Sequence, residues 1–185
     1  MHRRYYHLIK TGFGGVGISW KPGEAGGIIE RVFIPDPASS AKEKLLSSFP
    51  DSRPGRDKAI SVTADKIAAF MEGQDVSFGT GILDMGNCSE FQRRVLMAER
   101  EIPRGWISTY GRIGRRIGSE RGGRAVGRAL AGNPFPLIIP CHRTVRAGGL
   151  LGGFQGGPGM KRRLLELEGV EVSENGKVLT ANIYY

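Results

Sequence analysis

The segment Phe135-Pro136-Leu137-Ile138-Ile139-Pro140-Cys141-His142-Arg143 sets the interpretation of the chain around it. Its prolines exclude a helix, because each lacks an N–H donor, fixes its own φ and pushes the preceding residue towards extended backbone. We therefore expect Cys141 at the end of a short, buried, extended segment. A thiol on rigid backbone beside the imidazole of His142 suits a nucleophile, although a lone cysteine is more often buried and inert. These nine residues leave both interpretations open.

The composition is that of a globular protein rather than a membrane or disulfide-rich one. The chain has 185 residues, 39% of them hydrophobic, and only two cysteines. No apolar run approaches the ~20 residues that span a bilayer, and the first residues lack the apolar core of a signal peptide. We therefore expect a protein of the reducing cytoplasm, with no membrane contact.

Positive charge is concentrated in one segment. The net charge is +9, and residues 101–170 hold twelve Lys and Arg against four Glu and no Asp. Such asymmetry favours a polyanion as partner. The alternative is a solubilising face, although mixed charges would serve solubility as well.

The first half of the sequence indicates a small sheet with helices. β-branched and aromatic runs at 5–9, 16–20 and 28–34 predict strands, and helices are expected at 39–49 and 61–71. Glycines from Gly79 to Asn87 suggest a linker, so we divide the chain into domains at 1–85 and 86–185.

The second half begins with two predicted helices. Ser89 and Gln92 have the spacing of a capping box, which predicts a helix ending near Arg100. Ser108 can cap a second helix that stops at Gly118. Two short helices joined by a tight turn indicate a helix-turn-helix.

A third helix is expected to begin at Ser119 or Glu120 and to run to about Ala131. Arg121, Arg124 and Arg128 share one of its faces, and apolar residues occupy the other. An arginine face beside small residues fits a nucleic-acid groove, whereas the simpler alternative is a solvated surface.

Downstream of Cys141, residues 146–159 contain seven glycines and predict a flexible loop that could enclose a substrate. A helix follows and ends at Gly169. Glu168 lies in its last turn, where the helix dipole disfavours a carboxylate, so a specific partner is expected.

These residues together resemble one family. Gly132-Asn133-Pro134-x-Pro136-x-x-x-Pro140-Cys141-His142-Arg143 is similar to the signature of the O6-alkylguanine-DNA alkyltransferases, and the resemblance extends from Phe91 to Gly169. It implies an α/β (α+β) protein. A small N-terminal ribonuclease-H-like α/β domain would precede a mainly helical, winged helix-turn-helix-like domain that carries the active site.

The resemblance also implies a reaction, the irreversible transfer of an alkyl group from guanine O6 to Cys141. His142, oriented by Glu168, would take the thiol proton; Tyr110 would assist the guanine, and Asn133 would brace the turn before Cys141. The implied DNA-binding residues are Arg124, Arg121, Arg128, Ala125 and Gly127. The implied base-pocket residues are Thr144, Phe154, Gln155, Gly156 and Gly157.

The implied partner is double-stranded DNA containing O6-alkylguanine, with O4-methylthymine as a further substrate left open. The target base must be flipped out of the stack, with Arg124 filling the gap. We expect a monomer that uses no metal and no cofactor.

Three rival functions remain. A lesion-flagging relative lacks the acceptor thiol, which this chain keeps as Cys141. A helix-turn-helix regulator would explain the arginines but not the proline-framed Cys-His with a distant Glu168. A thiol-protease-like hydrolase would need an oxyanion hole, and its His is rarely the residue after the Cys.

Overall fold

The computed structural model describes residues 3–185 and consists of two compact units. The first contains the chain up to Asn87 together with Pro134–Ile138, and the second contains Cys88–Asn133 and Ile139–Tyr185. Residues Pro134–Ile138 belong to the first unit because they contact its sheet: the N–H of Val32 donates to the carbonyl of Pro134 (2.8 Å). The predicted division of the chain at residue 85 does not include this second segment.

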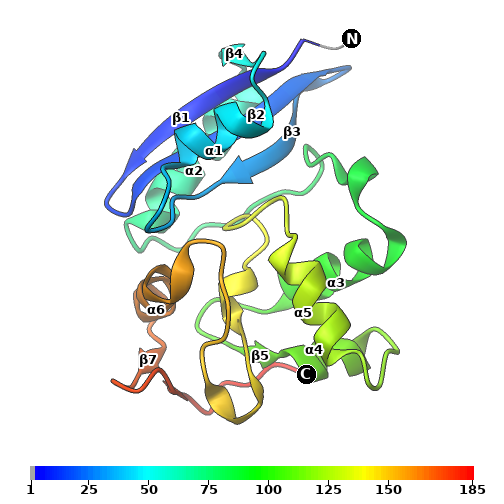
Figure 1. The fold of residues 1–185 in the computed structure, drawn as a ribbon, viewed down its shortest axis with the longest axis vertical. Helices are drawn as coiled ribbons and strands as arrows, with labels where there is room; N and C mark the ends of the chain where they lie inside the picture. Colours follow the sequence, from blue (N-terminus) through cyan, green and yellow to red (C-terminus); the bar gives the residue numbers. More distant parts are fainter. Residues whose placement is uncertain (1–2) are drawn as a thin grey trace. The chain divides into compact units, whose positions relative to one another are not determined.

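A four-stranded sheet forms the centre of the first unit (Figure 1). Its strands are β1 (Tyr5–Thr11), β2 (Gly14–Gly23), β3 (Gly26–Phe33) and β4 (Arg53–Pro54), in the order β3-β2-β1-β4. The first three are antiparallel hairpin neighbours, while β4 pairs with β1 in parallel. The three long strands were predicted. The two-residue β4 was not, because it lies in a polar, proline-containing connection.

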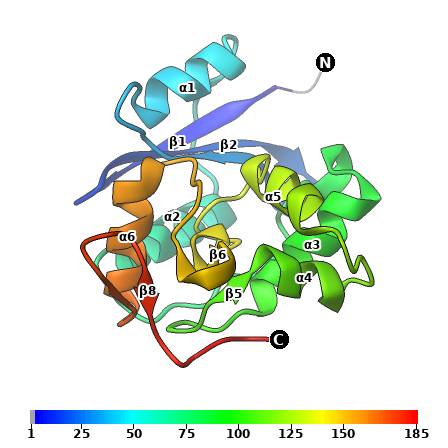
Figure 2. The ribbon, with the colours of Figure 1, turned by 60° about the horizontal axis from the view of Figure 1, so that its bottom comes forward.

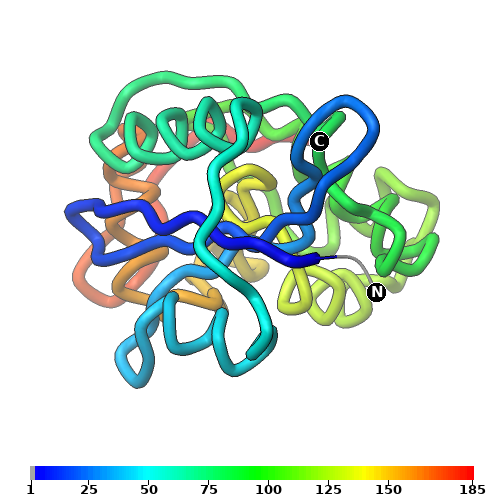
Figure 3. The backbone as a smooth tube through the Cα atoms, turned by 90° about the horizontal axis from the view of Figure 1, so that it is seen from above, coloured from blue at the N-terminus to red at the C-terminus, as the bar shows by residue number. Residues whose placement is uncertain are grey.

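Two helices cover opposite faces of this sheet, α1 (Ala41–Ser48) and α2 (Lys58–Met71) (Figures 2 and 3). Ser40 caps α1 in a reciprocal capping box with Glu43. The helix α2 begins three residues earlier than predicted, because the Asp57 side chain accepts the N–H groups of two residues in its first turn. Isoleucine and leucine side chains fill the fully buried core: Ile18, Ile29, Ile34, Leu45, Ile60 and Ile67.

The expected linker at 79–87 is in part a structural piece of the first unit. The N–H of Ile29 donates to the carbonyl of Ile82 (2.7 Å), and the N–H of Asp84 donates to the carbonyl of Ile29 (2.8 Å). Asp84 also forms an ion pair with Lys21 (2.5 Å). These contacts attach the segment to the edge of β3, and a 3₁₀ turn, η1 (Met85–Asn87), follows.

The second unit is mainly helical. Its helices are α3 (Glu90–Glu101), α4 (Tyr110–Arg116), α5 (Gly123–Ala131) and α6 (Gly157–Leu167). Its sheets are small: a parallel pair, β5 (Ser108–Thr109) with β6 (Thr144–Val145), and a hairpin, β7 (Glu171–Val172) with β8 (Val178–Leu179). Two 3₁₀ turns, η2 (Cys141–Arg143) and η3 (Ala147–Gly149), complete it. A small sheet unit and a mainly helical unit confirm the predicted α+β class.

Helix starts in the second unit differ in detail from the sequence expectation. Ser89 caps α3, but the Gln92 amide reaches the carbonyls of Ala129 and Gly132 rather than closing a capping box. Thr109, not Ser108, caps α4. Ser108 is buried and donates to a carbonyl of the C-terminal segment, which removes it from the cap. The helix α5 starts three or four residues later than expected.

No helix within residues 3–185 combines the length and apolar character needed to cross a bilayer.

Candidate active site

The segment that leads to Cys141 is buried, as predicted, but it is not extended throughout. Leu137 has a φ of 74°, in the left-handed region that non-glycine residues rarely occupy, so the backbone turns there. Beyond Pro140 the chain enters the 3₁₀ turn η2, and Cys141 is its first residue. The prolines exclude an α-helix, as expected, and the result is a series of tight turns.

Cys141 lies within hydrogen-bonding distance of an amide. The Nδ2 atom of Asn133 lies 3.3 Å from Sγ of Cys141 and 3.1 Å from the carbonyl oxygen of Ile139. Burial raises the pKa of the thiol to about 12, although the Asn133 hydrogen bond acts in the opposite direction. The resting thiol is therefore protonated at neutral pH and needs a base before it can act as a nucleophile.

The imidazole of the next residue, His142, can serve as such a base, and a carboxylate lies on its other side. Nε2 of His142 lies 2.9 Å from Oε1 of Glu168, and both side chains are fully buried. Glu168 is the residue that ends α6, where the sequence predicted a specific partner for its carboxylate. A neutral imidazole that donates its Nε2–H to Glu168 keeps Nδ1 as its acceptor nitrogen.

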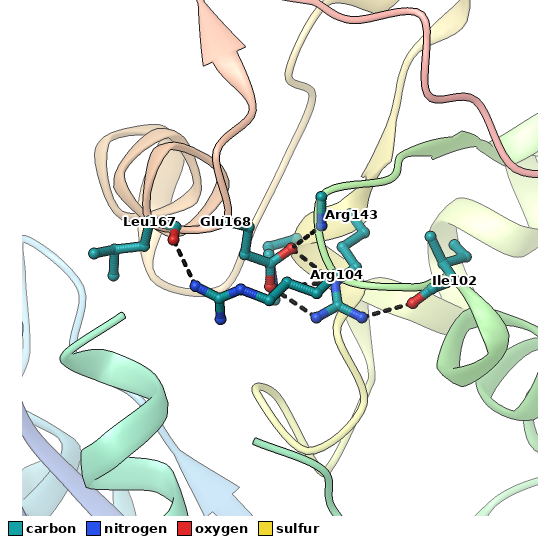
Figure 4. A network of polar contacts seen from close by, with 7 residues as sticks. Ile102, Arg104, Arg143, Leu167 and Glu168 are labelled. Carbon is teal, nitrogen blue, oxygen red and sulfur yellow. Dashed lines mark hydrogen bonds and ion pairs between the residues drawn. The ribbon is translucent and has the colours of Figure 1, made fainter. Parts of the chain in front are cut away.

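Arg143 binds the same carboxylate, a contact that the sequence does not predict (Figure 4). Its Nε lies 2.9 Å from one oxygen of Glu168, its NH2 group donates to the other (2.8 Å), and NH1 donates to the carbonyl of Ile102 (2.6 Å). Arg104 closes the network by donating to the carbonyl of Leu167 (2.6 Å). An arginine in a sequence is ordinarily expected to be exposed to solvent, so no pattern in the sequence indicated that Arg143 binds Glu168.

The pKa values of both groups lie below their ordinary values, which favours a neutral His142 and an ionised Glu168. Burial lowers the pKa of His142, although the charge and hydrogen bond of Glu168 oppose the shift. Burial alone would raise the pKa of Glu168, but the charge and hydrogen bonds of His142 and Arg143 outweigh it and lower that pKa to about 2. At neutral pH the pair is therefore a neutral imidazole oriented by a carboxylate, which is the arrangement a general base requires.

Cys141 borders a cavity of about 240 Å³. Tyr110, at the first position of α4, also lines it, together with Phe154 and Gln155 from the glycine-rich loop. Burial is the main cause that raises the pKa of the Tyr110 phenol, so its hydroxyl stays protonated and can donate a hydrogen bond into the cavity. Gly152, with a φ of +72°, lets the loop approach, since a Cβ there would lie 3.1 Å from the Tyr110 hydroxyl.

Three of the five residues expected in the base pocket lie elsewhere. Thr144 is fully buried, and its hydroxyl donates to the carboxylate of Glu99 (2.5 Å) rather than facing the cavity. Gly156 is the N-cap of α6 and Gly157 is its first residue, with a φ of 81° in the left-handed region. Gly127, expected at the DNA surface, instead lines the cavity, where a Cβ would lie 3.8 Å from the Tyr110 ring.

The arginine side chains of the third predicted helix are exposed. Arg124 and Arg128 lie on α5, and Arg121 lies in the turn before it. Val126 and Leu130 on the same helix are buried, so α5 has one cationic face and one packed face. Its position in the second unit can be followed in Figure 2.

Two buried charged residues lie near the thiol and were not predicted. Glu99 of α3 and Lys161 of α6 are both fully buried, and both bond to Thr144. Burial raises the pKa of Glu99 to about 7 and lowers that of Lys161 to about 8. Periodicity gave no signal for them, because each occupies a helix whose polar residues are mostly solvated.

No group of three or more His, Cys, Asp or Glu side chains in the described part of the chain could hold a metal ion. The buried Cys141, the His142–Glu168 pair, the adjoining cavity and the cationic helix α5 define a DNA-directed protein with a cysteine nucleophile.

Comparisons with known proteins agree with that class. Residues 90–170 match the family model described as 6-O-methylguanine DNA methyltransferase, DNA binding domain. The methylated-DNA–protein-cysteine methyltransferase of Methanothermobacter thermautotrophicus is 47% identical over 114 residues, which cover 62% of this chain and 64% of that protein. The corresponding protein of Methanosarcina mazei is 32% identical over 164 residues, which cover 89% and 96% of the two chains.

A solved structure is similar over the same extent. The Mycobacterium tuberculosis protein OGT, in complex with DNA, superimposes with a TM-score of 0.69 at 31% identity and covers 89% of this chain and 92% of its own. The chain belongs to the methylated-DNA–protein-cysteine methyltransferase family. Direct transfer of an alkyl group from DNA to a cysteine of the protein is the repair activity of that family, and the rival functions are not favoured.

Proposed function

We propose that this protein repairs DNA by transferring the alkyl group of O6-alkylguanine to Sγ of Cys141. The observation that carries the proposal is the 2.9 Å contact between His142 and Glu168 beside a cysteine that borders a cavity. A hydrolase would use such an array to release product. A family of cysteine methyltransferases uses it to keep the alkyl group.

The reaction is a displacement at the alkyl carbon. His142 takes the thiol proton, the sulfur forms a bond to the alkyl carbon, and the bond from that carbon to guanine O6 breaks with its electron pair leaving on the base. Tyr110, held in its protonated form, donates a hydrogen bond to the guanine as negative charge develops there. The thioether has no hydrolytic route back to the thiol, so each molecule reacts once.

DNA binding in this proposal uses α5. Because the alkylated atom is stacked inside the duplex, the nucleotide is flipped into the cavity beside Tyr110 and Phe154. Arg121 and Arg128 face the phosphates, and Arg124 fills the space that the flipped base leaves. The DNA complex of the similar M. tuberculosis protein supports DNA as the partner. The protein acts as a cytoplasmic monomer.

The roles proposed for Asn133, Phe154 and Gln155 follow from their contacts. Asn133 donates to both Sγ of Cys141 and the carbonyl of Ile139, and so fixes the thiol relative to its own turn. The Gln155 amide donates to the carbonyl of Asn133 (2.8 Å), which ties the pocket loop to the same turn. Phe154 offers a ring on which a flipped base can stack.

The test is repair of a duplex that contains one O6-methylguanine. The protein in excess should convert the lesion to guanine, as seen by chromatography of the digested DNA, with no added metal or cofactor. Persistence of the lesion under conditions where the duplex is bound would contradict the proposal and favour a non-reactive, lesion-flagging role.

A further inference from the structure

Glu99 and Lys161 are two buried residues of opposite charge that have no role in the alkyl-transfer step described above. Both side chains are fully buried in the second unit, on α3 and α6. Burying two charges has a large desolvation cost, and hydrophobic replacement of such groups is often neutral or stabilising. Stability alone is therefore a weak explanation for keeping them beside a reactive thiol.

Both side chains bind the same residue. The hydroxyl of Thr144 donates to Oε2 of Glu99 (2.5 Å), and Nζ of Lys161 donates to the carbonyl oxygen of Thr144 (2.6 Å). Thr144 is thus held through its side chain by an acid and through its backbone by an ammonium group. Lys161 also donates to the carbonyl of Gly153 (3.3 Å), in the loop that carries Phe154 into the cavity.

Thr144 is a junction between the parts of the site. It follows Cys141-His142-Arg143 directly and begins β6, which pairs in parallel with β5 in the register Ser108 with Thr144. The strand β5 leads straight into Tyr110, the first residue of α4. Fixing Thr144 therefore fixes three things at once: the turn with the thiol, the strand that places Tyr110 and, through Lys161, the pocket loop.

We propose that Glu99 and Lys161 are positioning residues for alkyl transfer, which clamp Thr144 from two sides and set how the reaction depends on pH. The inference rests on the proposed function, because it concerns the rate of that same transfer.

The charges of Glu99 and Lys161 shift the pKa of the Cys141 thiol in opposite directions. The Glu99 carboxylate raises the pKa of Cys141, and the Lys161 ammonium lowers it, both after the larger effect of burial. The charge of Arg143 also lowers the pKa of Glu99, and the Glu99 carboxylate raises the pKa of Tyr110. The charge of Arg146 lowers the pKa of Lys161. Since the pKa of Glu99 is about 7, the acid loses its proton near neutral pH.

The expected direction follows from these signs. Above about pH 7 Glu99 is ionised and opposes thiolate formation, and below that pH it is neutral while Lys161 stays charged. A Glu99→Gln variant keeps an oxygen acceptor for the Thr144 hydroxyl but cannot ionise. Its transfer rate relative to the wild type should rise about threefold or more between pH 6 and pH 8.

Substitution of Lys161 removes its contacts with Thr144 and Gly153 and so tests the positioning role. Lys161→Met should slow single-turnover transfer at saturating DNA about ten- to hundredfold, the range expected when reacting groups shift by about 1 Å. DNA affinity should not change, because the side chain is buried. Lys177→Met, which removes an exposed lysine of the β7–β8 hairpin, serves as the matched control.

A double variant distinguishes a slow transfer caused by lost positioning from one caused by unfolding of the protein. Glu99→Leu with Lys161→Met replaces both charged groups by apolar ones of similar size, which should preserve the fold, as thermal unfolding will show. It should transfer as slowly as Lys161→Met and lack the pH response of the wild type. A folded double variant that transfers at the full rate, or an unchanged pH–rate profile in Glu99→Gln, would overturn the inference. A wild type that gains no alkyl group in the same assay would instead overturn the proposed function.

Discussion

The Nδ2 atom of Asn133 lies 3.3 Å from the sulfur of Cys141, so the amide that braces the active-site turn also donates towards the nucleophile. A donor at this distance stabilises the thiolate more than the thiol. The same nitrogen reaches the carbonyl of Ile139, which leaves little freedom to the residues between them. Asn133 therefore links the fold of the turn to the chemistry of its cysteine.

Asn133→Ala should slow alkyl transfer about tenfold, the cost of one net hydrogen bond of about 1–1.5 kcal/mol. It should also lower the free energy of unfolding by about 1–3 kcal/mol, because buried acceptors lose their donor. Gln92→Ala removes another side-chain amide that binds nearby carbonyls but not the thiol, and it is the control. Equal transfer rates for the two variants, measured per folded molecule, would remove Asn133 from the chemistry.

Cys141→Ser should abolish transfer while DNA affinity stays within about twofold of the wild type, because the arginines of α5 are unchanged. Fluorescence anisotropy with a labelled duplex measures the affinity. Cys88→Ser removes the other buried cysteine and should repair normally. Joint loss of transfer and of binding in Cys141→Ser would mean that the thiol is structural.

Glu168 should make the protein sensitive to acid. Its pKa in the fold is lowered to about 2, below the value of about 4.5 for an unperturbed carboxyl, so its contribution is complete above pH 4.5 and is lost as the pH falls towards 2. The loss amounts to about 3 kcal/mol, from the size of the shift. Glu99, whose pKa is raised, contributes no change in that window.

Urea unfolding of the wild type and of Glu168→Gln at several acidic pH values measures this contribution. The wild type should lose stability more steeply than the variant between pH 4.5 and 2. Parallel curves would show that the contacts of Glu168 with His142 and Arg143 do not hold the carboxylate in its ionised form.

Arg124→Ala should slow repair of an O6-methylguanine duplex more than reaction with free O6-benzylguanine, because only the duplex requires a base to be extruded. Arg115→Ala removes an exposed arginine of α4 and provides the control for charge. If Arg124→Ala slows both substrates equally, its proposed role in filling the gap is wrong.

Short-range chemistry in the sequence predicted much of the fold. Proline placement around Cys141, the β-branched and aromatic runs of the strands and the apolar faces of the helices all act over a few residues, and the structure contains the expected elements. Boundaries moved where a neighbouring side chain made the better cap, as Asp57 and Thr109 do. The strand β4 has only two residues, too few for any pattern.

Some residues of the site could be predicted from the sequence and others could not, for a physical reason. The position of Glu168 at a helix C-terminus indicated only that its carboxylate needs a partner, and the family resemblance implied that this partner is His142; the two side chains lie 2.9 Å apart. Arg143, Glu99 and Lys161 could not be predicted, because each is an ordinary charged residue until tertiary packing buries it. Thr144 was expected to line the pocket, yet its hydroxyl turns to Glu99, a contact 45 residues distant in the chain.

The most direct test of the account is the mass of the cysteine peptides after reaction with an excess of O6-methylguanine duplex. The peptide that contains Cys141 should gain the mass of one methyl group, the Cys88 peptide should gain none, and the reaction should stop at one methyl per protein molecule. An unmodified Cys141 peptide, or lesion loss that continues beyond one equivalent, would contradict it.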